Sequence, residues 1–470
     1  MKRIDVLPDD VLLEIFDFYV NMSLSYRRKG PRREAWQMLV HVCRRWRSLV
    51  FGSPRRLNLR LFFTSRTPAK GTLDIWPALP LVVDGLLASS SSTDNVIAVL
   101  GQSNRVSQVS LALAGWQLEN VLAAMQVPFP ELTELRLNSY DNTPPVIPDS
   151  FLGGSAPSLL FFKLVRISFP GLPKLLLFAT HLVHLRLSDI PHSGYISPGA
   201  MITLLSALSS LETLYLGFEY PQSRPDWQTP GLLPPKRFIL PALKKVRFKG
   251  VTGYLEELVN SIDTPQLDEM YIHFFNQNQI DFDCPRLAQF INCTPALRAF
   301  DEARVRFIDG TAGVKLRHRT SESDFDDLGI DISRGEPDRQ LSFVARLCNS
   351  SLPPLSTIVD LYIEHRYWLL GQNFDAIENT MWLEVLLPFT AVKNLYLCKG
   401  FAPGIAAALE ELVGDRVTKI LPNLQNIFVE GREQSGPFKT NIKQFLTARK
   451  VSSHPITIFC WGNNSGVERK

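Results

Sequence analysis

Cysteine is scarce in this chain, and its spacing excludes two classes of protein. No two of the six cysteines form a CxxC pair, so neither a disulfide-stapled secreted domain nor a structural zinc site fits the pattern. We expect free cysteines, no bound metal and no cofactor. The six positions are Cys43, Cys284, Cys293, Cys348, Cys398 and Cys460.

Long apolar runs are missing as well. The longest candidate, residues 175–187, is interrupted by His181, His184 and Arg186, whereas a membrane helix needs roughly 18 consecutive apolar residues. The opening segment MKRIDVLPDDVLLEIF mixes acids into its apolar stretch and lacks the cleavage site of a secretory signal. We therefore expect no membrane partner, and a cytoplasmic or nuclear location.

Catalytic signatures are also absent from the sequence. It contains no GxxxxGK[ST], GxGxxG, GxSxG or HExxH motif. His181 and His184 are the nearest approach to a metal pair, but THLVHLRL alternates like a strand, in which positions three apart face opposite sides. The acidic run at 322–331 does not have the spacing of a calcium loop. We expect no catalytic residues and no enzyme.

Leucine is abundant, and charge is divided unevenly along the chain. Leucine fills 67 of 470 positions. Residues 1–60 carry 13 Lys and Arg against 6 Asp and Glu, whereas the other 410 residues carry 37 against 40. The net charge of +4 is therefore the difference between a head of +7 and a remainder of −3. This division predicts two parts with different roles.

The head consists of two amphipathic segments. Pro8, Asp9 and Asp10 are typical of a helix start, because proline suits the first turn and acids favour its positive end. Two sets of apolar residues then recur at helical spacing, and the first is expected to form one apolar face. They are Val11, Leu12, Ile15, Phe16 and Tyr19, followed by Trp36, Leu39, Val40, Cys43, Trp46, Leu49 and Val50.

These two segments carry a resemblance. LPDDVLLEIF followed by LVHVCRRWRSLV resembles an F-box, over about 45 residues and with both halves in order. The resemblance implies a three-helix domain over 1–54 that binds the Skp-type adaptor and, through it, the cullin of a ubiquitin ligase. It also implies the adaptor-binding residues, which would be Leu7, Pro8, Leu12, Ile15, Phe16, Val42, Cys43, Trp46 and Leu49.

A basic stretch separates the two halves of this motif. Five of the seven residues at 27–33 (RRKGPRR) are Lys or Arg, and they lengthen the gap between Phe16 and Val42 relative to the family. The stretch suits a solvated loop, a nuclear import signal or a phosphate contact. No aromatic residues are interleaved with it, so nucleic acid is not the favoured partner.

The remaining chain repeats a short unit, in which the pattern is apolar, two variable, apolar, one variable, apolar. Seven consecutive copies begin 23–32 residues apart, which is a solenoid period. The copies with the strongest pattern are Val106/Val109/Leu111, Leu132/Leu135/Leu137, Leu159/Phe162/Leu164, Leu182/Leu185/Leu187, Leu211/Leu214/Leu216, Leu243/Val246/Phe248, Leu267/Met270/Ile272, Ile358/Leu361/Ile363, Val392/Leu395/Leu397 and Leu424/Ile427/Val429.

Helical segments are predicted between these strands, at 199–208, 253–260, 339–349, 382–387, 405–413 and 439–449. Units of one strand and one helix bury their leucines by stacking. The pattern over residues 55–461 resembles leucine-rich repeats, which implies an α/β solenoid with a parallel sheet on the concave side and helices or loops on the convex side. The rhythm fades at 301–357, and residues 462–470 are expected to form a C-terminal tail.

A candidate target-binding surface follows from this register. The variable residue between the last two apolar positions of each copy should point out of the concave face, where Tyr and Arg are favoured at protein interfaces. The basic part, 136–247, suits an acidic or phosphorylated segment, and the aromatic part, 271–428, suits an apolar anchor. The predicted residues are Arg136, Lys163, Arg186, Tyr215, Arg247, Tyr271, Tyr362, Tyr396 and Phe428.

Three functions remain open at this point. The favoured hypothesis is a non-catalytic receptor that joins an unidentified target protein to a cullin–RING ligase. A second is a plain repeat scaffold whose N-terminal helices only cap the open end of the solenoid. A third is a nuclear protein that uses the basic stretch at 27–33.

Overall fold

The computed structural model describes most of the chain and divides it into two compact units, Met1–Leu182 and Val183–Lys470. Each unit is described by itself. The described residues are 7–25, 35–64, 67–86, 90–141, 145–220, 237–275, 284–308, 311–319, 327–333, 337–351, 355–366, 378–412, 414, 416–431 and 442–461. The basic stretch at 27–33 and the predicted tail at 462–470 lie outside them.

The first unit opens with three helices, α1 (Asp9–Ser25), α2 (Ala35–Val40) and α3 (Arg44–Gly52). The first turn of α1 contains Asp9 and Asp10, which complement the positive end of the helix dipole. At the start of α3, the Cys43 thiol accepts a hydrogen bond from the backbone N–H of Trp46 at 3.4 Å. Three helices were expected within residues 1–54, and the described part of that segment contains three.

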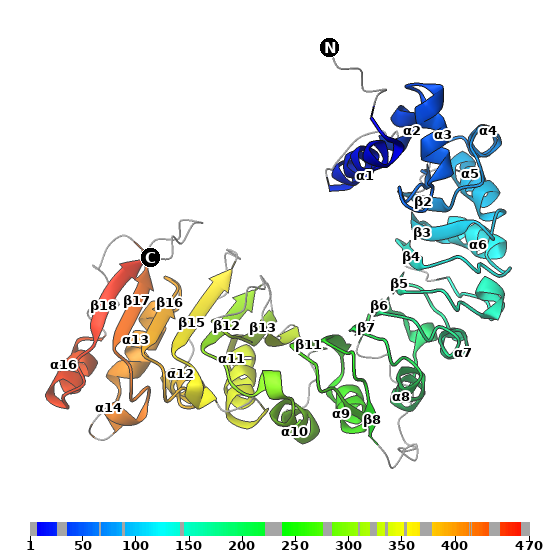
Figure 1. Ribbon diagram of the computed structural model, residues 1–470. Coiled ribbons are helices and arrows are strands. Elements are labelled where there is room, and N and C mark those ends of the chain that lie inside the picture. Colours follow the sequence, from blue (N-terminus) through cyan, green and yellow to red (C-terminus); the bar gives the residue numbers. More distant parts are fainter. Residues whose placement is uncertain are drawn as a thin grey trace. The chain divides into compact units, whose positions relative to one another are not determined.

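Repeats of a strand and a helix follow. Strands β1 to β5 pair in sequence order and in parallel, and the helices lie along one face of this part of the sheet (Figure 1). The elements are β1 (Leu61–Phe63), α4 (Ala69–Ile75), β2 (Leu81–Leu86), α5 (Ser90–Leu100), β3 (Val106–Leu113), α6 (Gly115–Ala124), β4 (Glu134–Ser139), a 3-10 turn at Phe151–Gly154, β5 (Phe161–Val165) and α7 (Leu172–Leu176).

The second unit continues the same architecture. Its main sheet has the strand order β6-β7-β9-β11-β14-β13-β12-β15-β16-β17-β18, and its helices also lie along one face (Figure 1). A separate two-stranded parallel sheet, β8 with β10, lies among the helices of the second unit.

The elements of the second unit have the following bounds. They are β6 (His184–Ile190), α8 (Pro198–Ser206), β7 (Thr213–Phe218), β8 (Phe238–Ile239), β9 (Lys245–Gly250), α9 (Thr252–Ser261), β10 (Ile262–Asp263), β11 (Glu269–Phe275), α10 (Pro285–Cys293), β12 (Glu302–Ile308), β13 (Thr311–Arg317), β14 (Leu328–Ser333), α11 (Pro337–Arg346), β15 (Asp360–Arg366), α12 (Asn379–Leu386), β16 (Asn394–Leu397), α13 (Ala402–Glu410), α14 (Arg416–Lys419), β17 (Asn426–Glu430), α16 (Lys443–Val451) and β18 (Thr457–Trp461). Short 3-10 or π turns occur at His192–Gly194, Pro295–Leu297, Leu347–Ser351 and Leu355–Thr357.

A hairpin interrupts the parallel order where the repeat rhythm fades. After β11 the chain forms β12 three strand positions further along, returns antiparallel as β13, and fills the position next to β11 with β14. The turn back into β14 is held by the Asp327 carboxylate, which accepts a 2.7 Å hydrogen bond from the His318 backbone N–H. This insertion adds two strands to the sheet.

The repeated apolar residues form the core, as predicted. In each of the ten copies named above, the last two apolar positions lie in a strand, and they are buried in all copies except the last, where Val429 is half-buried. They stack across neighbouring strands in register. For example, Leu135 pairs with Val109 on one side and with Phe162 on the other. Each of the six predicted helical segments also overlaps a helix. The chain is therefore an α/β solenoid of leucine-rich-repeat type, which confirms the expected fold class.

Candidate protein-binding surfaces

Helix α1 has two apolar stripes with different environments. One stripe, Leu12, Phe16 and Val20, is 0–6% exposed and packs inside the head. The other is open to solvent, and it includes Ile15 at 42% and Phe18 at 67% exposure. Val11 and Tyr19 belong to the same open stripe, at 39% and 46%. The prediction of a single apolar face is therefore wrong, because α2 and α3 cover only part of a wide apolar arc.

The predicted adaptor residues divide in the same way. Ile15 and Val42 are exposed, at 42% and 57%, whereas Leu12 and Phe16 are completely buried. The placement of Leu12 and Phe16 on a contact surface is therefore corrected, because both side chains belong to the core of the head. Four other apolar side chains of the head are exposed but were not among the predicted adaptor-binding residues: Val11, Phe18, Tyr19 and Met38.

The other predicted adaptor residues lie around this stripe. Pro8 is exposed, and Leu7, Cys43, Trp46 and Leu49 are half-buried. The Trp46 ring packs on the buried Phe16 ring, with 4.7 Å between centroids. Trp46 therefore packs against the buried side of α1 and is also partly exposed.

An arginine on α3 holds the start of α1. The Arg45 guanidinium donates hydrogen bonds to the Asp9 carboxylate, at 2.5 and 3.0 Å, and to the Leu7 carbonyl at 2.6 Å. These contacts join the two halves of the F-box-like motif, which are 36 residues apart in sequence. The exposed stripe of α1 is thus presented from a fixed helix.

The head also packs on the first repeat. The Trp36 ring is buried and contacts Trp76, just after α4, with 5.1 Å between centroids in an edge-to-face arrangement. Its indole Nε1 donates a 3.1 Å hydrogen bond to the carbonyl of Arg60, and Phe51 completes the cluster. The head therefore covers the first repeat with α2 and α3.

The second candidate surface is one row of side chains across the sheet face that points away from the helices. We call it the open-face row, and it contains one position from each strand of the main sheet except β1. In the first unit it runs through Asp84, Ser110, Arg136 and Lys163. In the second unit it runs through Arg186, Tyr215, Arg247, Tyr271, Gly329, Lys315, Arg304, Tyr362, Tyr396, Phe428 and Phe459.

All nine predicted target-binding positions fall in this row. Sequence reasoning missed Lys315, Gly329 and Arg304, because the hairpin that carries them lacks the repeat pattern, and it missed Phe459, because the last strand departs from it. The register confirms where the predicted residues lie. Their role in binding a target remains a prediction.

Neighbouring side chains of the row stack on one another. The Arg186 guanidinium lies 4.6 Å from the centre of the Tyr215 ring, and the Arg304 guanidinium lies 4.7 Å from that of Tyr362. From Tyr362 onward the row is entirely aromatic, and the rings of Tyr362, Tyr396, Phe428 and Phe459 stack nearly parallel, with 4.2–5.0 Å between successive centroids. The ring faces contact one another, so the row presents ring edges and tyrosine hydroxyls to solvent.

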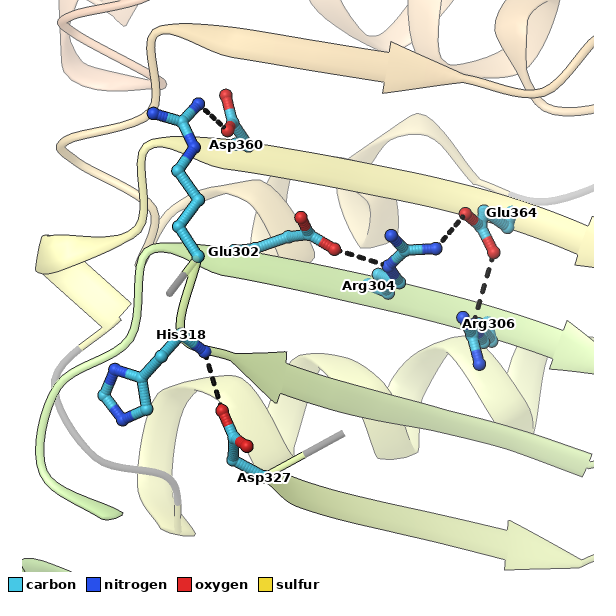
Figure 2. Close-up of polar contacts among 8 residues, drawn as sticks. Glu302, Arg304, Arg306, His318, Asp327, Asp360 and Glu364 are labelled. Atoms are coloured by element: carbon cyan, nitrogen blue, oxygen red, sulfur yellow. Dashed lines mark hydrogen bonds and ion pairs between the residues drawn. The ribbon is translucent and has the colours of Figure 1, made fainter. Parts of the chain in front are cut away.

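A buried charge network supports the middle of the row (Figure 2). Arg304 lies between Glu302, at 2.6 Å, and Glu364, at 3.4 Å, and the other oxygen of Glu364 accepts from Arg306 at 3.2 Å. Burial lowers the pKa of Arg304, but the charges of Glu302 and Glu364 outweigh that effect and raise it overall. These contacts hold Arg304 against the Tyr362 ring.

A polar ladder accompanies the aromatic part. The buried Asp360 carboxylate accepts a 2.7 Å hydrogen bond from Asn394, whose side-chain oxygen accepts a 2.8 Å bond from Asn426. The Asp360 carboxylate also makes an ion pair with the Arg319 guanidinium. Because this ladder and the aromatic stack run across the same strands, both stabilise the same strand register.

Comparisons with known proteins give low similarity. No family model matches the chain, and no curated protein matches it by sequence. Among solved structures, a leucine-rich repeat-containing protein of Legionella pneumophila, LegL7, is 13% identical over 82% of this chain and 97% of its own, with a TM-score of 0.28. A chain of the Rad7–Elc1 complex of yeast is 12% identical over 91% of this chain and 90% of its own, with a TM-score of 0.24. Both scores are below 0.5, so the repeat fold is assigned from the strand register and packing.

The described residues offer neither a membrane-spanning helix nor a cluster of metal ligands. None of the described helices is long and apolar enough to cross a membrane. The described histidine, cysteine and acidic side chains include no cluster of three or more that could hold a metal ion. His181 and His184, the pair considered from the sequence, belong to no such cluster.

Proposed function

We propose that this protein is a non-catalytic substrate receptor of an SCF-type cullin–RING ubiquitin ligase. The head would bind a Skp-type adaptor, and the open-face row would bind the target protein. The observation that supports this most strongly is the exposed stripe of α1, Val11, Ile15, Phe18 and Tyr19, which lies within the sequence that resembles an F-box. Contiguous exposed apolar side chains of this kind favour a protein partner.

The chemistry of such a receptor is proximity alone. Tethering a target near a ubiquitin-loaded enzyme raises its effective concentration without any catalytic group in the receptor. The proposal therefore assigns no nucleophile, base or metal to this chain, and it assigns the protein to the cytoplasm or the nucleus, where the ligase works.

Affinity purification with mass spectrometry tests this function in cells. Wild-type protein should recover the adaptor, a cullin and target proteins. A double variant of the stripe, Ile15→Lys with Phe18→Lys, should lose adaptor and cullin while keeping the targets. Recovery of the cullin by the variant at the wild-type level would reject the proposal.

The contacts of Trp36 favour a second candidate, in which the head caps the solenoid. Trp36, Phe51 and Trp76 form a cluster between the head and the first repeat, and an uncovered repeat end would expose this apolar surface. The two candidates use different faces of the head. A scaffold without ligase function would need the Trp36 cluster and would tolerate charge on the α1 stripe.

A further inference from the structure

The inserted hairpin creates a cavity on the open face where the basic and aromatic parts of the row meet. The cavity has a volume of about 320 Å³, at the lower end of the range for small-ligand sites. Val246 and Met270 are buried and form its floor. Its polar walls come from three strands, and they are Lys245, Arg247, Glu269, Tyr271 and Lys315.

The position of Tyr271 accounts for the cavity. Its neighbour in the row is Gly329, and a Cβ at that position would lie 2.8 Å from Cδ2 of the tyrosine ring. The ring therefore occupies the space of the missing side chain, and its hydroxyl donates a hydrogen bond to the Asp331 carboxylate on the same strand, β14. Because Tyr271 leans toward β14, the space between it and Arg247 is left open.

The hairpin also supplies a cation to this cavity. Lys315 of β13 lies in the row next to Gly329, and its ammonium lies 5.3 Å from the centre of the Tyr271 ring. Lys245 makes a 2.6 Å ion pair with Glu269 at the opposite wall. Three cations against one carboxylate give the lining a net charge of +2.

Nearby ionisable groups leave this balance positive. The Asp331 carboxylate accepts the Tyr271 hydroxyl but keeps its negative charge, so Arg247, Lys315 and Asp331 together carry a charge of +1. Asp268 interacts electrostatically with the Lys245–Glu269 pair at the opposite wall, and Asp189 makes a 2.9 Å ion pair with Lys249. Burial lowers the pKa of His273, and the charge of Lys249 lowers it further, so both effects disfavour a positive charge on this histidine. A half-buried site with excess positive charge favours an anionic group over a neutral one.

We propose that this cavity receives one anionic side chain of the target, a carboxylate or a phosphate on an extended segment lying along the open face. Arg247 and Lys315 would bind the anion from the two sides, and the Tyr271 ring would contact its stem. This inference rests on the proposed function, because it assigns a ligand chemistry to the target-binding row.

Peptide binding by the full-length protein tests the site. The probes are three pools of short fluorescent peptides, uncharged apart from a fixed central phosphoserine, glutamate or serine. Wild-type protein should bind an anionic pool about tenfold more tightly than the serine pool. The better anionic pool identifies phosphate or carboxylate as the group received.

Two matched variants locate the effect. Arg247→Gln with Lys315→Gln should abolish the preference for the anionic pool without changing the melting temperature. Arg416→Gln with Lys419→Gln, the same charge change at two exposed residues of α14 outside the row, should keep it. No preference in wild-type protein, or an equal loss in both variants, would overturn the site. So would binding of a single-stranded oligonucleotide that is lost in the cavity variant while no peptide pool is preferred.

Adaptor binding separates this failure from failure of the proposed function. The cavity variant should bind the adaptor as wild-type protein does. Wild-type protein that binds the adaptor but shows no peptide preference would reject the cavity alone, and wild-type protein that prefers an anionic pool but does not bind the adaptor would reject the receptor role alone.

Discussion

The rings of Tyr362 and Tyr396 stack face to face across strands β15 and β16, with 4.2 Å between centroids and 6° between planes. The two residues are 34 positions apart in sequence, but they occupy the same place in consecutive repeats. Tyr396 stacks equally closely on Phe428, at 4.5 Å. Removal of the middle ring therefore breaks two contacts at once.

Tyr396→Ala should lower the free energy of unfolding by about 1–3 kcal/mol, because each aromatic pair contributes about 0.5–1.5 kcal/mol beyond its buried area. Urea unfolding followed by circular dichroism measures the change. Tyr396→Phe keeps both stacks and should cost much less. Equal losses in the two variants would show that the hydroxyl, rather than the stacking, stabilises this part of the sheet.

The raised pKa values of two tyrosines in the row predict that the protein becomes less stable at alkaline pH. Burial raises the pKa of Tyr271 and of Tyr362, and the neighbouring charge of Asp331 raises that of Tyr271 further. The folded state therefore keeps these protons at a pH where the unfolded chain releases them. Stability is then fully present below the ordinary tyrosine pKa of about 10 and falls as the pH rises above it.

The free energy of unfolding, measured from about pH 8 to about pH 11.5, tests this prediction, because the interval spans the ordinary tyrosine pKa of about 10. Wild-type stability should decrease above pH 10, and Tyr271→Phe should make that decrease shallower. At neutral pH the same variant should lose about 1 kcal/mol, because it removes the hydrogen bond to Asp331. Stability that rises with pH over this interval would contradict the assignment.

Arg449 fixes the last helix of the second unit through main-chain contacts. Its side chain is fully buried, and its guanidinium donates to the carbonyls of Val417, Leu421, Pro422 and Leu424 at 3.1–3.3 Å. Arg449→Met would leave these buried carbonyls without a donor. We expect a loss of about 1–3 kcal/mol, the cost of leaving buried polar groups unsatisfied.

The adjacent Lys450 provides the matched control, since it is exposed on the same helix. Lys450→Met should change the melting temperature little, whereas Arg449→Met should lower it clearly. Hydrogen exchange should place the loss in α14, α16 and the segment between α14 and β17. If both variants melt alike, the carbonyl contacts contribute nothing measurable.

Trp36 tests the packing of the head on the first repeat. Trp36→Ala should destabilise the first unit by about 3–5 kcal/mol, because it removes a buried ring and the hydrogen bond to the Arg60 carbonyl. Thermal unfolding measures the loss. The stripe variant Ile15→Lys with Phe18→Lys should melt close to wild type, because both side chains are exposed. A large loss in the stripe variant would mean that the stripe is part of the core.

The sequence predicted the repeating parts of this fold well. Leu135, Leu214 and Leu395 occupy the same place in separate repeats, and the fixed spacing around each of them defined strand, register and buried face together. The open-face row followed from the same spacing, since a strand alternates its two faces. These predictions needed only local periodicity.

The rest depended on contacts between distant segments. Strands β13 and β14 carry Lys315 and Gly329. The β13 sequence, TAGVKLR, lacks the repeat pattern, so its antiparallel pairing in a hairpin could not be predicted from the periodicity of the sequence. The burial of Phe16 beside the exposure of Ile15 depends on where α2 and α3 pack. Neither the cavity nor the open stripe of α1 could therefore be predicted from the sequence alone.

Binding of a purified Skp-type adaptor to the full-length protein, measured by calorimetry, tests the receptor role most directly. Wild-type protein should bind the adaptor one to one. Ile15→Lys with Phe18→Lys should weaken binding at least about 100-fold, as expected when two central interface residues are lost. The control places the same substitutions at two exposed apolar residues outside the head, Ile75→Lys with Val127→Lys, and should bind like wild type. No adaptor binding by wild-type protein, or equal binding by the stripe variant and the control, would contradict the account.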